Sequence, residues 1–330
     1  MHIVSITLAF AALSVPAAAQ GRPCLAAEAS CYEGIPAGSG KTLPAYRTFP
    51  VTRPNQDIRA AVIVVHGTRR DADRYFRAIV EAARIQGVLD TTLLIAPQFK
   101  AHGGACKDPV AEGELFWTCN GWKYGDKALN GEDDSFSAVD AVLRLLAGRE
   151  RFPALRSIVV TGHSAGGQFV QRYAAGNRID HDLGLPVRYV VANPSSYMYL
   201  DARRPTKNGF GAYEGAADCP DYNKYRYGME DRAGYLAATP DAEILARFPR
   251  RAVTYLAGEL DVRQDDPSLD KTCPAMAQGP NRRERALNFA NYIRTLYKAG
   301  HAFAVVPSCG HDARCIYVSA EGRRAVFPAP

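Results

Sequence analysis

A serine stands between two glycines at the point where a predicted strand becomes a predicted helix. The segment IVVTGHSAGGQFVQRYAAG (158–176) passes from β-favouring residues into Gly-His-Ser-Ala-Gly (162–166) and then into an amphipathic run. So abrupt a turn strains the backbone of its central residue, and flanking side chains would clash, so glycines are needed there. The strand would carry Ser164 to the carboxyl edge of a sheet, beside the positive end of a helix dipole. We therefore interpret Ser164 as a nucleophile; the alternative is that the glycines only make a turn.

A serine hydroxyl is a weak nucleophile until a base accepts its proton, and histidine is the usual base. Among the seven histidines, His311 in SCGHD directly follows the last predicted strand, at the edge where Ser164 should emerge. His163 is expected to be fixed within the turn and to point elsewhere. The geometry that a catalytic triad requires therefore favours His311 as the base.

The base of such a triad needs a carboxylate to orient it. Asp261 ends the run YLAGELD, one strand before the histidine, and should lie at the same sheet edge. Asp265 and Asp266 follow in a loop, where they could cap a helix or, with Asp270, bind calcium. Glu259 is expected on the strand itself, turned away. We favour Asp261 because it directly ends the strand.

An oxyanion that develops during acyl transfer needs preorganised N–H donors. The N–H of Ala165, directly after the serine, would supply one at the start of the helix. The N–H of Thr68, in the His-Gly-Thr turn (66–68) after the first buried strand, is our choice for the second. Arg69 follows this turn and is either a contact for an acidic substrate group or an ordinary surface residue.

These residues need a scaffold that brings distant turns to one edge. Near-continuous apolar runs predict strands at 60–65, 91–99, 157–161, 187–196, 251–261 and 302–312, and helical patterns cover 71–87, 133–148, 166–175 and 282–298. This alternation predicts an α/β fold in which helices cover both faces of a mostly parallel central sheet. Residues 20–58 are irregular and are expected to add a strand or hairpin to a single domain that spans 20–330.

Residues 197–250 interrupt the alternation and hold seven of the seventeen tyrosines. We interpret them as a tyrosine-rich, cap-like insertion over the carboxyl edge of the sheet. Aromatic faces suit ring-containing or polymeric substrates, which makes Tyr197 and Tyr199 candidate substrate-binding residues. The alternative is that the tyrosines pack the insertion for its own stability.

Residues 1–19 are typical of a secretory signal peptide, with an apolar run, Pro16 and an Ala-Ala-Ala cleavage site, although no Lys or Arg precedes the run. An uncleaved anchor is the alternative, but the run is shorter than the roughly 20 residues that a span needs. No later segment is apolar enough to cross a bilayer. We therefore expect a secreted or periplasmic protein.

Eight cysteines follow the predicted signal, and an even number in an exported chain predicts disulfides. Pairing near neighbours gives Cys24–Cys31, Cys106–Cys119, Cys219–Cys273 and Cys309–Cys315. Neither Cys-x-x-Cys nor His-x-x-x-His spacing occurs, so we expect no metal, and the sequence points to no cofactor. The net charge of +6 is scattered among acidic residues, which argues against nucleic-acid binding.

The motif GHSAG on a strand–helix turn, VVHGT upstream, and the order Ser, Asp, His resemble the α/β-hydrolase superfamily over about residues 58–315. GHSAGG also resembles secreted serine esterases and polyester depolymerases. The oxyanion turn is H-G-T rather than the HGGG of many lipases and esterases, which argues against a simple lipase. The resemblance implies a hydrolase that cleaves small or polymeric carboxylic esters. A peptidase or amidase of the same fold, and a catalytically silent binding protein, are the alternatives.

Overall fold

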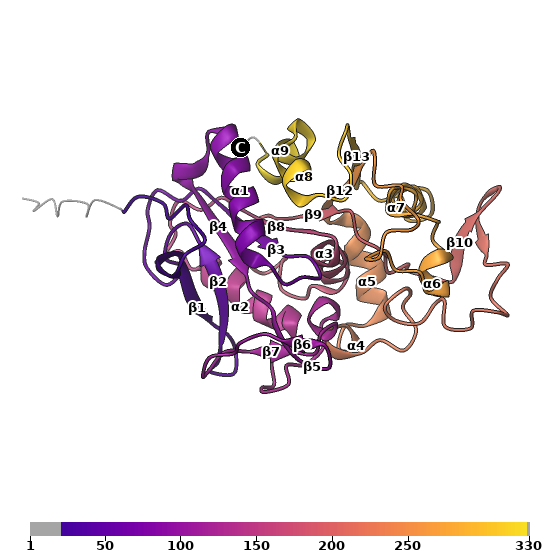
Figure 1. The fold of residues 1–330 in the computed structure, drawn as a ribbon, viewed down its shortest axis with the longest axis horizontal. Coiled ribbons are helices and arrows are strands. Elements are labelled where there is room, and N and C mark those ends of the chain that lie inside the picture. The colour runs from indigo at the N-terminus through magenta and orange to yellow at the C-terminus, as the bar shows by residue number, and fades with distance from the viewer. Residues whose placement is uncertain (1–20, 329–330) are drawn as a thin grey trace, which may run out of the picture.

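An eight-stranded sheet runs through the molecule in the order β1-β2-β4-β3-β8-β9-β12-β13 (Figure 1). The computed structural model describes residues 21–328, so the predicted signal peptide lies outside the described residues. Six strands are parallel: β4 (Thr92–Pro97), β3 (Ala60–Val65), β8 (Ser157–His163), β9 (Val187–Ala192), β12 (Ala252–Gly258) and β13 (Ala302–Val306). The antiparallel hairpin of β1 (Tyr32–Pro36) and β2 (Thr42–Arg47) extends one edge through β2 and β4. The predicted α/β fold with a mostly parallel sheet is confirmed.

Helices cover both faces of the sheet, which explains why its strands are apolar along their whole length. Along β3, Val62 and Val64 join one buried cluster, whereas Ile63 and Val65 join the other. The first face is covered by α1 (Ala72–Gln86), α8 (Ala313–Val318) and α9 (Ala320–Val326). The second is covered by α2 (Ser135–Ala147), α3 (Ala165–Gly176), α5 (Asp241–Arg247) and α7 (Arg282–Tyr297).

Several of the predicted strands end earlier than the apolar pattern indicated. The chain leaves β9 at Ala192, because Asn193 has a positive φ of 45°, and it leaves β13 at Val306, shortly before Ser308 at φ 57°. β12 likewise ends at Gly258, so Asp261 lies in the following turn, where its N–H donates to the Gly258 carbonyl over 3.1 Å. The residues beyond these strand ends form loops at the carboxyl edge.

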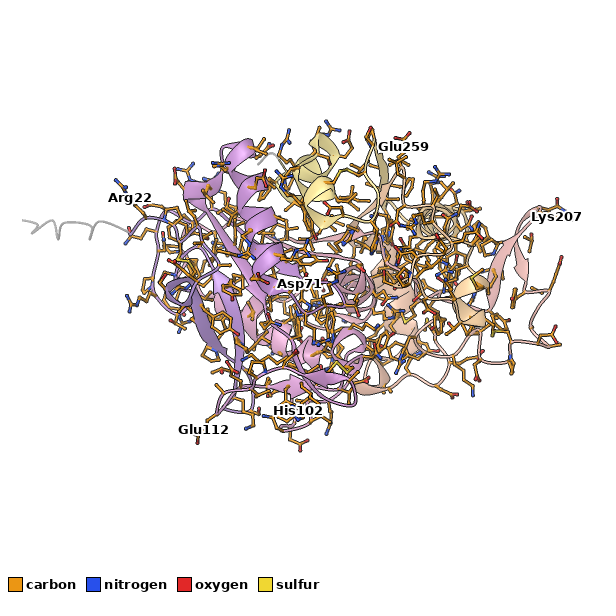
Figure 2. All side chains as sticks on the ribbon, viewed as in Figure 1. Arg22, Asp71, His102, Glu112, Lys207 and Glu259 are labelled. Atoms are coloured by element: carbon orange, nitrogen blue, oxygen red, sulfur yellow. A yellow bond between two sulfur atoms is a disulfide. The ribbon has the colours of Figure 1, made fainter. Side chains whose placement is uncertain are left out.

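The tyrosine-rich insertion (197–250) lies toward one end of the sheet. It contains the hairpin of β10 (Arg203–Thr206) and β11 (Gly209–Ala212), the short helix α4 (Gly234–Ala237) and α5. Lys207, at the tip of the hairpin, projects at the far end of the molecule from Arg22, whereas Asp71, after β3, lies near the middle of this view (Figure 2). The hairpin therefore extends away from the turn after β3 rather than over it.

The remaining elements are short. A small sheet contains β5 (Lys100–Gly103), β6 (Cys106–Lys107) and β7 (Phe116–Trp117), and α6 (Cys273–Met276) precedes α7. Single 3₁₀ turns occur at Ala29–Cys31, Leu89–Thr91, Gly121–Tyr124 and Phe248–Arg250. Within residues 21–328, no helix has both the length and the apolar character needed to span a bilayer.

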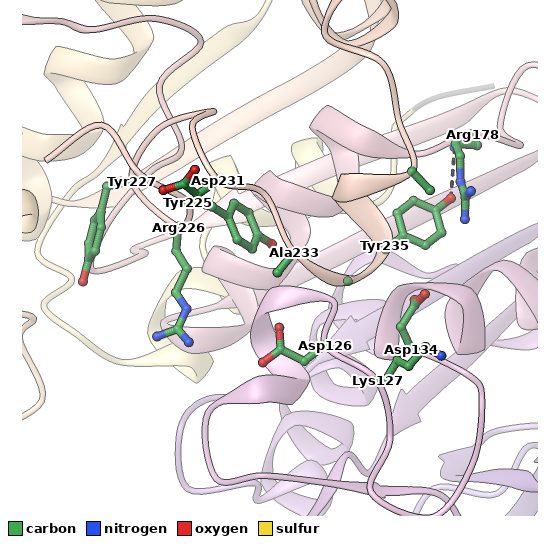
Figure 3. Close-up of a pocket in the computed structure, with 12 residues that line it drawn as sticks. Asp126, Lys127, Asp134, Arg178, Tyr225, Arg226, Tyr227, Asp231, Ala233 and Tyr235 are labelled. Carbon is green, nitrogen blue, oxygen red and sulfur yellow. Dashed lines mark hydrogen bonds between the residues drawn. The ribbon is translucent and has the colours of Figure 1, made fainter. Parts of the chain in front are cut away.

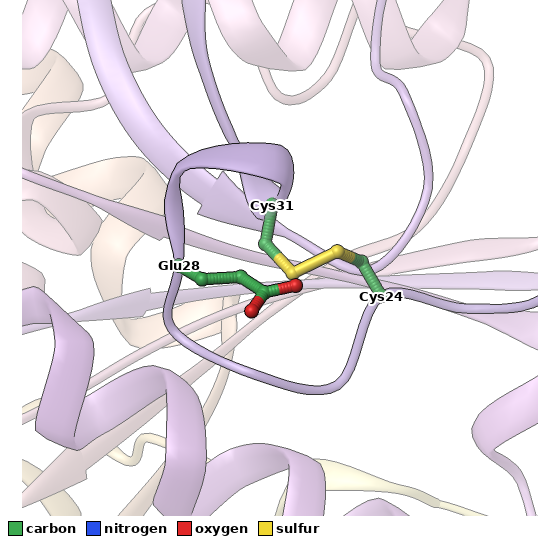
Figure 4. A group of neighbouring side chains, drawn as sticks. All are labelled: Cys24, Glu28 and Cys31. Carbon is green, nitrogen blue, oxygen red and sulfur yellow. A yellow bond between two sulfur atoms is a disulfide. The ribbon is translucent and has the colours of Figure 1, made fainter.

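All four disulfides join the cysteines that the sequence paired: Cys24–Cys31, Cys106–Cys119, Cys219–Cys273 and Cys309–Cys315. Glu28 lies beside the first bridge, and these three side chains are close enough to resemble a metal site (Figure 4). The two sulfur atoms are bonded to each other, however, so they offer no thiolate ligand. The cluster is therefore a disulfide with a neighbouring carboxylate.

Candidate active site

The turn between β8 and α3 has the strained geometry that its glycines predict. Ser164 has φ 60° and ψ −119°, a conformation that residues other than glycine rarely adopt. A Cβ atom at Gly162 would lie 2.3 Å from the Gly166 carbonyl oxygen, and one at Gly166 would lie 2.1 Å from the Val65 oxygen. Both positions therefore require glycine, and the serine is held at the start of α3.

Ser164, His311 and Asp261 form one hydrogen-bonded chain. The Ser164 Oγ lies 3.0 Å from His311 Nε2, and His311 Nδ1 lies 2.8 Å from Asp261 Oδ2. With the Nδ1 proton donated to the carboxylate, Nε2 is free to accept the serine proton. The structure thus brings together three residues that the sequence placed in separate loops at the carboxyl ends of β8, β12 and β13.

The rival acids have other partners. Asp265 pairs with Arg263 on the surface, and Asp270 accepts hydrogen bonds from Thr272. Asp266 accepts from the N–H and hydroxyl of Ser268; although burial opposes ionisation, these bonds and Arg282 hold the pKa of Asp266 below its usual range. Among the described residues, the His, Cys, Asp and Glu side chains of this loop form no group of three with closely spaced ligand atoms.

His163 lies closer to the triad than the sequence suggested. Its ring centroid is 4.6 Å from that of His311, and its Nδ1 is 3.2 Å from the Tyr75 hydroxyl. Burial holds the pKa of His163 well below its ordinary value, and the neighbouring His311 and Arg282 lower it further. His163 therefore stays neutral and packs beside the base without contacting the Ser164 hydroxyl.

Two backbone N–H groups lie beside Ser164, at the positions chosen from the sequence. Ala165 begins α3, and Thr68 lines the cavity in front of the serine. Within the described chain, neither N–H donates to a backbone carbonyl, so both are available to an external acceptor. The turn that carries Thr68 approaches closely, since a Cβ at Gly67 would lie 3.7 Å from the Ser164 Cβ.

Two side chains that the sequence analysis did not assign support this turn. His66 is buried, and burial lowers its pKa to about 4. Its Nδ1 donates to the Gly67 carbonyl over 2.9 Å, and its Nε2 accepts from the Phe99 N–H over 3.0 Å. Tyr75, on α1, packs its hydroxyl against Gly67. A Cβ atom at Gly67 would lie only 2.6 Å from the Tyr75 hydroxyl oxygen. The position of His66 directly after β3 could have indicated its role in this turn, whereas nothing in the sequence singles out Tyr75.

The cavity in front of Ser164 has a volume of about 400 Å³ and polar walls. Its lining residues include Arg69 and Arg74, which follow β3 in the chain, and Asp266 and Ser268, which follow β12. No Leu, Ile, Val, Met, Phe or Trp is among the lining residues. Arg69 lines this cavity, and its side chain is exposed.

The expectation that Tyr197 and Tyr199 contact substrate is wrong for this structure, because both side chains are fully buried. Tyr197 stacks on Phe289 of α7 with ring centroids 4.6 Å apart, and Tyr199 packs against Tyr292 at 4.5 Å. Both tyrosines stand at the start of the insertion, where packing against α7 buries their rings.

The insertion lines a different cavity, of about 750 Å³ (Figure 3). Its walls include Tyr225, Arg226 and Tyr235 from the insertion, facing Asp126 and Arg178. Neither cavity shares a lining residue with the other, and no residue of 197–250 lines the cavity at Ser164. The described residues of the insertion therefore do not form the walls of the cavity at Ser164.

Comparisons with known proteins agree with this geometry. Residues 62–326 match the family model described as "Alpha/beta hydrolase family". A similar solved structure is poly(aspartic acid) hydrolase-1 from Sphingomonas sp. KT-1, with 21% identity, a TM-score of 0.63, and coverage of 90% of this chain and 97% of that one. Another is the poly(3-hydroxybutyrate) depolymerase LpqC from Bordetella parapertussis, with 21% identity, a TM-score of 0.56, and coverage of 83% and 80%. No curated protein matches this sequence.

Proposed function

The chain belongs to the alpha/beta hydrolase family, and from that premise we propose that it is an exported serine hydrolase that cleaves carboxylic esters. The observation that carries the proposal is the hydrogen-bonded chain from Ser164 Oγ through His311 to Asp261. A binding protein would have no need to keep a strained serine in line with a base and its acid.

In the proposed reaction, Ser164 Oγ attacks the ester carbonyl carbon while His311 Nε2 accepts the hydroxyl proton. The N–H groups of Thr68 and Ala165 stabilise the negative charge on the carbonyl oxygen. The imidazolium passes its proton to the leaving alcohol, which leaves an acyl-enzyme. Water, deprotonated by His311, then attacks the acyl-enzyme and releases the acid and the free serine.

The polar cavity walls favour a short or polar acyl group over a long aliphatic chain. Arg69, at the cavity and exposed, is a candidate contact for an acidic group of the substrate. Polymers are candidate substrates as well, since the two similar structures are named as hydrolases of poly(aspartic acid) and poly(3-hydroxybutyrate). At 21% identity this likeness supports only a choice of compounds to test. Four disulfides support the proposed export to a secreted or periplasmic location.

A fluorophosphonate probe tests the proposal because it labels only an activated serine. We expect the wild-type protein to be labelled and Ser164→Ala to be unlabelled but folded. Hydrolysis of nitrophenyl esters should fall several orders of magnitude in Ser164→Ala, since triad residues act as a unit. A nitrophenyl ester series, aminoacyl anilides and a polyester film, assayed together, separate an esterase from an amidase. Wild-type hydrolysis by Ser164→Ala would exclude the proposed nucleophile.

A further inference from the structure

Arg282, the first residue of α7, buries its guanidinium behind the candidate triad. Its side chain is 1% exposed, and its Nη1 lies 3.4 Å from Asp261 Oδ1. Because His311 occupies Oδ2, the two oxygens of this carboxylate are shared between the base and the arginine. A buried charge is costly unless it is paired and hydrogen-bonded, so this contact constrains both side chains.

The same guanidinium reaches the wall of the Ser164 cavity. Its Nη2 donates to Ser268 Oγ over 2.8 Å and lies 3.4 Å from Asp266 Oδ1. Its Nε donates to Ser195 Oγ, after β9, over 3.0 Å. One guanidinium thus joins the triad acid, a second carboxylate at the cavity and the loop after β9. Arginine suits this role because its planar guanidinium presents several N–H donors in fixed directions.

We propose that Arg282 is a positioning residue for the reaction: it fixes the orientation of Asp261 and neutralises part of the negative charge that the two carboxylates direct at His311. This inference rests on the proposed function of Ser164, His311 and Asp261. The base must be neutral to accept a proton, and neighbouring negative charge favours its protonated form. The negative charge that reaches the base from Asp261 and Asp266 therefore depends on Arg282.

Other charged and titratable groups also surround the base. His163 at the end of β8 packs beside the base, and Tyr197 after β9 and Arg282 on α7 lie near Asp261. The other charged and titratable residues that line the same cavity as His311 are Arg69, Asp71, Arg74, Tyr75, Asp266, Asp312 and Arg314. His163 stays neutral, and Tyr197 has a pKa raised well above its ordinary value, first by burial, so it is neutral too. Among the charged groups of the described residues, Arg282 is the one whose side chain contacts the Asp261 carboxylate.

Arg285 provides a matched control one turn along the same helix. It is as buried as Arg282, but it donates to the backbone carbonyls of Gly279, Ser195 and Asp270, and within residues 21–328 it forms no ion pair with a carboxylate. Loss of either arginine removes a buried cation and its hydrogen bonds from α7. Only loss of Arg282 changes the charge beside Asp261.

The test measures the rate of fluorophosphonate labelling of Ser164 as a function of pH. We expect the acidic limb to move up by about one pH unit in Arg282→Gln, because two carboxylates lose their cation. In Asp266→Asn it should move down, since Arg282 then neutralises Asp261 more fully. Arg282→Lys should keep the wild-type limb but label more slowly, because a point charge cannot serve three partners at once. Arg285→Gln should keep the wild-type limb.

Each outcome decides the inference. The inference would be overturned if the acidic limb of the labelling profile lay at the same pH in Arg282→Gln and Arg285→Gln. It would also be overturned if the limb moved in the same direction in Asp266→Asn as in Arg282→Gln. If Arg282→Gln does not fold, the direction of the Asp266→Asn shift and the limb of Arg282→Lys decide it. Failure of the proposed function looks different, because the wild-type protein would then be unlabelled or Ser164→Ala would label equally fast.

Discussion

Four aspartates lie between β12 and α6, namely Asp261, Asp265, Asp266 and Asp270, and Asp261 is the one of these described residues that hydrogen-bonds to His311. It is 3% exposed, whereas Asp265 pairs with Arg263 on the surface. Proximity in sequence therefore does not make these residues equivalent. In the turn after β12, the Asp261 N–H donates to the Gly258 carbonyl. This turn places the Asp261 carboxylate, and not its neighbours, against the base.

We predict that Asp261→Asn lowers kcat for a nitrophenyl ester by about 10⁴ while the protein remains folded. The amide can donate to His311 Nδ1, which favours the tautomer that cannot accept the serine proton at Nε2. Steady-state kinetics with circular dichroism checks the change. Asp265→Asn is the matched control and should cost little; a large loss there with none in Asp261→Asn would assign the acid to the loop.

Local steric rules explain why some residues of the site could be predicted from the sequence. Gly162 and Gly166 are required by contacts within the strand–turn–helix unit, so their spacing identifies Ser164. Arg282 and Tyr75 could not be found in this way, since their roles depend on partners that are remote in sequence. Tyr197 shows the opposite error: an aromatic residue beyond a strand suggested exposure, whereas α7 buries it.

At the scale of elements, the loop between β13 and α8 presents His311. Its Cys309 carbonyl accepts from the Leu260 N–H over 2.8 Å, and its Gly310 carbonyl accepts from Asn193 Nδ2 over 3.2 Å. These bonds join the loop to the segments after β12 and β9. The Cys309–Cys315 bridge closes the loop around the base.

We predict that replacing Cys309 and Cys315 together by serine lowers kcat more than it lowers the melting temperature. The bridge closes a short loop, so its loss raises the entropy of the unfolded chain only slightly and should cost little stability. A small displacement of a catalytic base, in contrast, lowers the rate strongly. Kinetics and thermal unfolding of the same preparation check this.

The matched control is the double serine variant of Cys106 and Cys119. That bridge closes a longer loop, worth roughly 3 kcal/mol in the chain-entropy model for about 15 residues, and it lies outside the triad loops. The control should lose more stability and less activity. The reverse ranking of the two double variants would make the Cys309–Cys315 bridge a stabilising link only.

The alternation of strands and helices was readable because each strand is apolar on both faces, and this pattern depends on local sequence alone. The structure of the insertion could not be predicted in this way, because its short elements have no strong periodicity. Its position is set by tertiary contacts such as the Tyr225 hydroxyl on the Tyr124 carbonyl and Arg172 on the Arg226 carbonyl. Composition indicated many tyrosines, but not the cavity that they would line.

At the scale of the whole molecule, one buried carboxylate joins three parts of the fold. Asp140 of α2 accepts a hydrogen bond from Tyr173 of α3 over 2.7 Å and from Tyr235 of the insertion over 2.9 Å. Burial raises its pKa to about 6, although the two tyrosine hydroxyls act in the opposite direction. The ordinary value of 3.8 applies when the chain unfolds.

This difference makes global stability depend on pH in a defined direction. Between about pH 4 and 6 the folded protein binds a proton at Asp140 that the unfolded chain does not, so stability falls as pH rises through this window. The shift from 3.8 to about 6 corresponds to at most about 3 kcal/mol, fully present as a cost above pH 6. Asp140→Asn keeps a neutral hydrogen-bonding side chain and removes the titration.

Urea unfolding of the wild-type protein and Asp140→Asn at pH 4.5 and 7.5 measures this contribution. The contributions of the other titrating groups are the same in both proteins, so they cancel when the variant is subtracted from the wild type at each pH. We expect the wild-type free energy of unfolding, relative to the variant, to be larger at pH 4.5 by about 2 kcal/mol. Asp90→Asn, which changes an exposed carboxylate, should show no such difference. A relative stability that is equal at both pH values would mean that the two tyrosine hydroxyls offset the cost of burial, so that folding leaves the pKa of Asp140 unchanged. A relative stability that is greater at pH 7.5 would mean that the carboxylate is stabilised as an anion. In that case the two tyrosine hydroxyls outweigh burial, and Asp140 joins the insertion to α2 and α3 as a charged anchor.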